Sequence, residues 1–144
     1  MSTPDHPVVS RYRLRRRVQF YETDTAGIVH FSWFYRYMEE AEHALWRAAG
    51  LSIAPPGAEI GFPRVAASFD FFKPLRFEDE FEVDLTIANI GEKAIHYNAQ
   101  VVKDGTLVAS GRLAVACVLK RLGEPMTATA IPPDIVKRFQ VAGS

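Results

Sequence analysis

The sequence predicts an α+β fold in which one long helix packs on an antiparallel sheet. One segment has apolar residues at the 3.6-residue period of a helix, whereas five others alternate apolar and polar residues as strands do. The pair Asp104-Gly105, between two of those strands, is typical of a type I′ hairpin turn. A chain of 144 residues, 48% of them hydrophobic, can bury a core without a disulfide or a structural metal. We therefore expect a single domain over residues 10–144, after a flexible arm over residues 1–9.

The first two elements flank a short loop. Residues 12–21 alternate apolar and polar side chains, which predicts a half-solvated strand that Arg16 interrupts. After the loop, Ser32 is placed to cap a helix of about 17 residues that Gly50 ends. The face of this helix that we expect to be buried comprises Phe34, Tyr37, Met38, Ala41, Ala44, Leu45 and Ala48.

The second half of the chain is predicted to form mostly strands. Its four alternating segments are residues 64–73, 81–87, 95–101 and 107–120, which we expect to pair in order as an antiparallel meander. Pro132 and Pro133 then precede a short helix over residues 134–140. One helix leaves part of such a sheet uncovered, so a free edge or face favours a second copy, and a homodimer is the smallest assembly we expect.

The most reactive feature of the sequence is Asp24, on a short loop with Gly27 ahead of the long helix. A carboxylate at this place has two interpretations. As a turn residue, Asp24 caps local backbone. Alternatively, it acts on an activated acyl group as nucleophile or general base. The free N–H groups at the start of a helix favour the second interpretation, because they can stabilise the oxyanion that develops.

The stretch Thr23-Asp24-Thr25-Ala26-Gly27-Ile28-Val29 resembles the Asp-x-x-Gly-x-Val signature of hotdog-fold thioesterases of the 4-hydroxybenzoyl-CoA thioesterase type, which include bacterial acyl-CoA thioesterases. The resemblance extends over residues 13–120. It implies a hotdog fold, in which an antiparallel β-sheet wraps around one long central α-helix in the order β-α-β-β-β-β, here with a short C-terminal helix. It also implies active sites formed across a subunit interface, in a homodimer or a homotetramer.

The resemblance implies a catalytic role for Asp24, with the backbone N–H of Phe31 polarising the thioester carbonyl. His30 is a third catalytic candidate, which can hydrogen-bond Asp24 or the substrate, or cap the helix start. Relatives often have asparagine and tyrosine where this chain has two aromatic residues that narrow or line the acyl pocket. The substrate-binding residues implied in this way are Gly27, Ile28, Trp33, Phe34 and Lys93, the last being the one basic residue left where some relatives hold the phosphates of CoA.

The reaction we expect is hydrolysis of an acyl-CoA or acyl-carrier-protein thioester to the free acid and the thiol. Two alternatives stay open, namely a hydratase or dehydratase of enoyl or hydroxyacyl thioesters, and a module that binds acyl thioesters without turnover. No cluster of His, Cys, Asp and Glu has the spacing of metal ligands, and no glycine-rich phosphate loop follows a strand. We therefore expect no metal and no cofactor.

Charge and cysteine content disfavour other classes of protein. The 17 basic and 17 acidic side chains balance, which argues against a nucleic-acid partner, and no apolar run predicts a membrane span. The single cysteine, Cys117, predicts a reducing, cytoplasmic setting and a buried thiol. The one dense basic cluster has three interpretations: a solvated strand edge, a CoA phosphate site or a nucleic-acid site. It comprises Arg11, Arg13, Arg15, Arg16 and Arg17.

Overall fold

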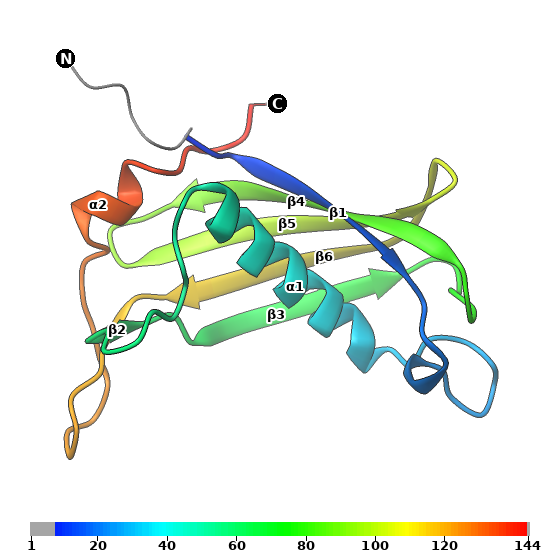
Figure 1. Ribbon diagram of the computed structural model, residues 1–144, viewed down its shortest axis with the longest axis horizontal. Helices are drawn as coiled ribbons and strands as arrows, with labels where there is room; N and C mark the ends of the chain where they lie inside the picture. The colour runs from blue at the N-terminus through cyan, green and yellow to red at the C-terminus, as the bar shows by residue number, and fades with distance from the viewer. Residues whose placement is uncertain (1–7, 144) are drawn as a thin grey trace.

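The computed structural model describes residues 8–143 and shows an antiparallel sheet packed around one long helix (Figure 1). This helix, α1 (Ser32–Ala48), lies across one face of the sheet, which is the hotdog arrangement that the sequence predicts. The other elements are β1 (Arg11–Arg17), the 3-10 helix η1 (Phe20–Glu22), β2 (Ile60–Gly61), β3 (Arg64–Phe71), β4 (Glu80–Ile90), β5 (Ala94–Lys103), β6 (Thr106–Ala116), β7 (Val118–Leu119), β8 (Thr127–Ala128) and α2 (Pro133–Val136).

The five long strands form one sheet in the order β1-β4-β5-β6-β3. Strands β4, β5 and β6 are a meander, as predicted, but β3 does not continue it. The prediction that β3 pairs with β4 is wrong because both edges of β4 are occupied. Tyr12 of β1 lies opposite Leu85, and β5 pairs with the other edge. Strand β3 therefore lies at the far edge beside β6, with Phe69 opposite Gly111.

The alternation predicted for β4 and β5 is confirmed by burial. Their inward side chains face α1, whose Tyr37, Met38 and Leu45 are also buried, and this interface is the core of the domain. Each valine, leucine, isoleucine, phenylalanine or methionine side chain among them contributes about 1.5–3 kcal/mol on burial. Asp104 and Gly105 join β5 to β6 with φ of 50° and 74°, the two positive values that the predicted type I′ turn requires. The inward residues of β4 and β5 are Phe81, Val83, Leu85, Ile87, Ile95, Tyr97, Ala99 and Val101.

Gly50 ends helix α1 as predicted. Its φ of 78° permits a Schellman motif, in which the N–H groups of Gly50 and Leu51 donate to the carbonyls of Arg47 and Trp46 at 2.9 and 3.0 Å. The predicted buried face of α1 is correct except for Ala48, which is exposed. The last turn of the helix instead buries the larger Trp46 side chain.

Several predicted ends of elements are wrong. The strand expected over residues 12–21 ends at Arg17, and a 3-10 helix follows. The strand expected over residues 107–120 ends before Cys117, because the chain leaves the large sheet there and β7 pairs with β2 and β8 in a second, smaller sheet. The terminal helix covers only Pro133–Val136, rather than residues 134–140.

The N-terminal segment is described from Val8 onward, so residues 1–7 of the expected arm lie outside the described residues. Val9 is buried and forms a parallel bridge with Phe139. Its N–H donates to the carbonyl of Arg138 at 2.9 Å. The folded domain therefore includes Val9, which the sequence assigns to the arm.

An ion pair that the sequence does not reveal lies beneath α1. Glu42 is 0% exposed, and its carboxylate lies 2.5 Å from Nη2 of Arg64 on β3. Arg64 also reaches Glu39 at 3.3 Å, and the Tyr97 hydroxyl lies beside the Glu42 carboxylate. Burial raises the pKa of Glu42, although the positive charge of Arg64 opposes the shift. This Arg64–Glu42 pair ties the middle of α1 to the edge strand β3.

The raised pKa of Glu42 predicts a pH-dependent contribution to stability. The folded state keeps the Glu42 proton to a higher pH than the unfolded chain does, so this contribution falls as pH rises from the ordinary carboxyl range through the folded-state pKa. The contribution is absent in Glu42→Gln. Urea unfolding of both proteins between about pH 5 and 8 should show the stability of wild type relative to the variant decreasing with pH. A difference that is independent of pH would contradict this expectation.

Candidate active site

The loop that carries Asp24 is closed by its own backbone. The Gly27 N–H donates to the Asp24 carbonyl, and the Asp24 N–H donates to the Ile28 carbonyl, both at 2.9 Å. Gly27 has a φ of 78°, a left-handed value that side chains disfavour. On the carboxylate, Oδ1 accepts the Ala26 N–H at 2.9 Å, whereas Oδ2 has no hydrogen-bond partner within residues 8–143. One oxygen therefore orients the side chain and the other is free to react.

The closed loop is attached to the segment that follows β3. The Val29 N–H donates to the Leu75 carbonyl at 2.8 Å, and Ile28 forms an antiparallel bridge with Arg76. A second bridge joins Thr23 to Val29 within the loop. These contacts fix Asp24 between the start of α1 and the end of β3.

The start of α1 leaves one backbone N–H free. Phe31 already has helical dihedral angles and precedes the helix without a side-chain cap, so the predicted Ser32 cap is wrong. The His30 N–H donates to the Glu22 carbonyl at 2.9 Å, and the Trp33 N–H donates to the His30 carbonyl at 3.0 Å. The Phe31 N–H has no acceptor in the described part of the chain. It can therefore bind an oxyanion.

An open cavity of about 460 Å³ lies between the Asp24 loop, the start of α1 and the end of β3. Its walls are mostly aromatic and aliphatic, and Asp24 and Lys73 are its charged residues. The rings of Phe34 and Phe71 meet edge to face, with centroids 5.0 Å apart. The lining residues are Asp24, Ile28, Val29, Phe31, Phe34, Phe71, Phe72, Lys73, Pro74 and Leu75.

The cavity brings together part of the predicted site. Gly27 shapes the turn behind Asp24 and does not line the cavity, and the Trp33 ring packs against Tyr21 with centroids 5.5 Å apart. Lys93 lies in the turn between β4 and β5, at the opposite end of the sheet from the Asp24 loop (Figure 1). The predicted residues that do meet at the cavity are Asp24, Ile28, Phe31 and Phe34.

The His30 side chain is exposed and does not line the cavity. Its Nδ1 lies 2.8 Å from the Ser32 hydroxyl and accepts the Ser32 N–H at 3.3 Å. Because Nδ1 is an acceptor, a neutral His30 carries its proton on Nε2. Of the roles that the sequence leaves open for His30, these contacts favour capping of the helix start.

The cavity wall contributed by the end of β3 is not predicted by the sequence. The strand expected to reach Lys73 ends at Phe71, and the N–H groups of Phe72 and Lys73 both donate to the Val108 carbonyl, at 2.8 and 3.2 Å. The chain then turns at Pro74 and runs past the Asp24 loop. One signal was available, since two consecutive aromatic residues break the strand alternation just before a proline.

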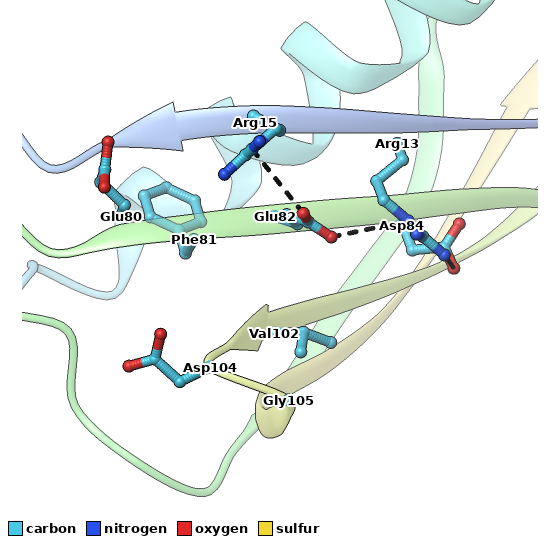
Figure 2. A pocket seen from close by; sticks show the side chains of 9 residues that line it. All are labelled: Arg13, Arg15, Glu80, Phe81, Glu82, Asp84, Val102, Asp104 and Gly105. Carbon is cyan, nitrogen blue, oxygen red and sulfur yellow. Dashed lines mark ion pairs between the residues drawn. The ribbon is translucent and has the colours of Figure 1, made fainter.

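The arginines of β1 are neutralised by acidic residues of β4. Figure 2 shows Arg13 and Arg15 beside Glu82, at 3.6 and 3.7 Å. The hollow of about 410 Å³ at this place is lined by two arginines and four carboxylates, an excess of negative charge that disfavours phosphate. Arg16 points the other way and pairs with Glu22 in the interior. These pairs support the interpretation of a solvated strand edge.

Few other groups in the described chain offer chemistry. Residues 8–143 contain no group of three or more His, Cys, Asp and Glu side chains that could hold a metal ion. Across the same residues, no helix has the length and apolar character that a membrane crossing needs. Burial raises the pKa of the Cys117 thiol, which disfavours the thiolate.

The fold and the cavity together define the class of this protein. It has a hotdog fold, and a carboxylate lies in the wall of an apolar cavity that is large enough for an acyl group. The family model of the thioesterase-like superfamily matches residues 18–139, and the chain belongs to that superfamily. An Aquifex aeolicus protein with the provisional name of esterase is 38% identical over 98 residues, which are 66% of this chain and 75% of the relative. The 1,4-dihydroxy-2-naphthoyl-CoA hydrolase of Crocosphaera subtropica is 30% identical over 94 residues, 64% of this chain and 69% of the relative.

A solved structure supports the same assignment. A hypothetical protein from Aquifex aeolicus superposes with a TM-score of 0.83 at 29% identity, over 90% of this chain and 99% of that one. The resemblance to hotdog-fold thioesterases that the sequence indicates is therefore confirmed.

Proposed function

We propose that the protein hydrolyses acyl-CoA thioesters, with the Asp24 carboxylate as nucleophile or general base and the Phe31 N–H as oxyanion donor. One observation carries this proposal: a carboxylate with a free oxygen and a backbone N–H without an acceptor belong to residues that line the same apolar cavity. A thioester is activated, so one carboxylate and one oriented donor suffice for its hydrolysis. The superfamily and the 30% identity to a CoA thioester hydrolase support this reaction.

The cavity favours a flat aromatic acyl group. Phe31, Phe34, Phe71 and Phe72 contribute rings to its wall, and aromatic rings pair well with one another at their faces and edges. The volume of about 460 Å³ lies in the range of small-molecule pockets. The relative from Crocosphaera subtropica is named for a naphthoyl thioester, which has such an acyl group.

A second copy of the chain completes the site in this proposal. Strand β3 is an edge of the sheet, and its Val65 is 61% exposed. Phe31, Phe71 and Phe72 at the cavity are 59%, 44% and 56% exposed, which leaves a large apolar surface in water. A homodimer that pairs along β3 covers this surface, and two dimers can form a tetramer. Analytical ultracentrifugation should give at least twice the chain mass of 16.1 kDa, and an active monomer would contradict the arrangement.

Lys73 is the cation best placed to bind the phosphates of CoA. It lines the acyl cavity and an adjoining hollow of about 320 Å³ that also includes Lys103. Lys103 is paired with Asp79 at 3.1 Å, whereas Lys73 forms no ion pair within residues 8–143. A compact, unpaired ammonium where the two spaces meet is suited to a phosphate.

The role of Lys73 predicts a selective loss of affinity. Lys73→Ala should raise KM for an acyl-CoA about tenfold, because a charged contact to phosphate is lost. KM for the N-acetylcysteamine thioester of the same acid, which has no phosphate, should change little. Lys93→Ala is the matched control and should leave both values unchanged. If Lys93→Ala alone raises KM for the CoA substrate, the phosphates are bound at the turn between β4 and β5, which carries the Lys93 that the resemblance names as a substrate-binding residue.

A substrate panel tests the proposed function against its alternatives. Aromatic and linear acyl-CoA thioesters, and the matching acyl-carrier-protein thioesters, are assayed with a thiol-detecting dye. We expect thiol release that is fastest with an aromatic acyl-CoA. Loss of enoyl absorbance without thiol release would favour the hydratase, and saturable binding without turnover would favour the binding module. Either result would overturn the proposal.

The compartment we propose is the cytoplasm. The chain has one cysteine, and its thiol is buried without a disulfide. Such a protein has no disulfide that an oxidising compartment would be needed to form or maintain. The proposal predicts that reducing agents leave both activity and stability unchanged.

A further inference from the structure

Glu22 is linked through its backbone to the segments that carry both reactive groups of the site, and it does not line the cavity. It precedes Asp24 by two residues, and its backbone carbonyl accepts the N–H of His30, the residue before Phe31, at 2.9 Å. This bond closes the base of the loop. It also gives the His30 N–H an acceptor. The Phe31 N–H, which has none among the described residues, is then the N–H available to an oxyanion. The placement of Glu22 therefore affects both the carboxylate and the oxyanion donor.

The Glu22 side chain is buried and held by three groups. It is 0% exposed, and Oε1 accepts the Gln19 N–H at 2.9 Å and the Tyr37 hydroxyl at 2.8 Å. Nη1 of Arg16 lies 2.6 Å from Oε2. Burial and the hydrogen bond to Glu22 raise the pKa of Tyr37, so its hydroxyl stays protonated and keeps donating. These contacts leave the Glu22 side chain little freedom to move.

Arg16 links Glu22 to both β1 and α1. Its Nε and Nη2 donate to the two carboxylate oxygens of Glu40 at 2.8 and 3.2 Å, and its guanidinium lies 4.6 Å from the centroid of the Tyr37 ring. Burial opposes the charge of Arg16, but hydrogen bonds and the charges of Glu40 and Glu22 outweigh it and raise the pKa of Arg16. We call this set of residues, Arg16, Glu22 and Tyr37, the loop clamp.

We infer that Glu22 is a positioning residue of the reaction, which holds the Asp24 carboxylate and the Phe31 N–H in their relative places through the loop clamp. Displacement of a reacting group by 1 Å can cost about 100-fold in rate, so loosening the base of this loop should lower kcat. The substrate does not touch Glu22 in this arrangement, so KM should change little. The kinetic part of this inference rests on the proposed function.

The chain supplies a matched control for a merely structural role. The Arg64–Glu42 pair has the same composition as the loop clamp, with a glutamate that is 0% exposed, an arginine 2.5 Å away and a neighbouring buried tyrosine, Tyr97. It anchors the same helix but does not contact the Asp24 loop. Glu22→Gln and Glu42→Gln therefore disturb equivalent buried pairs at different distances from the site.

The test compares these two variants in the full-length protein, below the melting temperature of each. We expect Glu22→Gln to lower kcat at least about tenfold with KM and the pH profile of kcat unchanged, and Glu42→Gln to keep wild-type kcat. Hydrogen exchange measured by mass spectrometry should show faster exchange in residues 23–31 of Glu22→Gln alone. As a second variant, Arg16→Lys should retain more activity than Arg16→Met, because an ammonium still pairs with Glu22.

Three results would overturn the inference: an equal fall of kcat in both glutamine variants, unchanged exchange in residues 23–31 of Glu22→Gln, or a displaced pH profile in that variant. The last would mean that Glu22 itself takes part in proton transfer. Failure of the proposed function is distinguishable, because wild type would then release no thiol while the exchange experiment still reports on the loop.

Discussion

Asp24→Asn is expected to lower kcat for thioester hydrolysis by about 1000-fold, with little change in KM. An amide neither attacks the carbonyl nor accepts a proton from water, so the chemical step is lost. The shape of the loop is retained, because the amide oxygen can still accept the Ala26 N–H that Oδ1 accepts in wild type. The measurement is thiol release at saturating substrate.

Asp134→Asn is the control for this prediction. Asp134 is a residue of α2 whose side chain is 90% exposed and does not line the cavity, and its substitution removes the same charge. We expect wild-type kcat. If Asp24→Asn kept more than about a tenth of the activity, or if both variants lost the same fraction, Asp24 would not be the catalytic group.

A single turnover in H₂¹⁸O, with enzyme in excess, separates the two roles proposed for Asp24. A general base delivers water to the thioester, so the product acid carries ¹⁸O from the first turnover. A nucleophile forms an anhydride whose hydrolysis at the Asp24 carboxyl leaves ¹⁸O in the enzyme and unlabelled oxygen in the first product. Mass spectrometry of the acid and of the peptide that contains Asp24 distinguishes these outcomes.

Arg64→Met is expected to have the largest effect on stability, a loss of roughly 3–5 kcal/mol in the free energy of unfolding. Methionine fills much of the space of the arginine stem but leaves the Glu42 carboxylate without a cation at 0% exposure. Because burial already raises the pKa of Glu42, protonation relieves part of this cost at low pH. Urea unfolding at neutral pH measures the full loss.

Arg13→Met is the matched control for Arg64→Met. The Arg13 side chain is 62% exposed, and its ion pair with Glu82 at 3.6 Å lies on the outer face of the sheet. Exposed pairs of this kind contribute at most about 1 kcal/mol. Equal losses in the two variants would show that burial of Glu42 is not what makes Arg64 important.

The sequence was sufficient to predict those elements whose pattern depends only on residues close together in the chain. The alternation of β4 and β5 and the period of α1 depend on neighbouring residues, and the positive φ at Asp104 and Gly105 follows from a two-residue signal. The family could be identified for a similar reason, because its signature is one short motif, and membership of the thioesterase-like superfamily is confirmed. Asp24 and Phe31 lie on one short stretch of chain.

Features that depend on distant segments were not predictable. Strand β3 pairs with β6 because β1 and β5 occupy both edges of β4. The sequence of one strand does not indicate which other strands pair with its neighbours. Glu22 and Glu42 lie in segments whose polar residues normally face water, and each is buried because an arginine from a strand reaches it. The wall formed by the end of β3 approaches Asp24 only in the folded chain.

The Asp24 loop takes its shape from hydrogen bonds among its own backbone groups, whereas Phe71 and Phe72 of the cavity wall come from a separate segment of the chain. In the proposed function, the catalytic carboxylate and these two residues of the aromatic wall therefore come from separate segments, which meet where the Val29 N–H donates to the Leu75 carbonyl. Substitutions at these two phenylalanines can change which acid is released while the reaction stays the same. Under the proposed function, point mutations at the end of β3 are thus a route by which descendants of this protein could accept other acids.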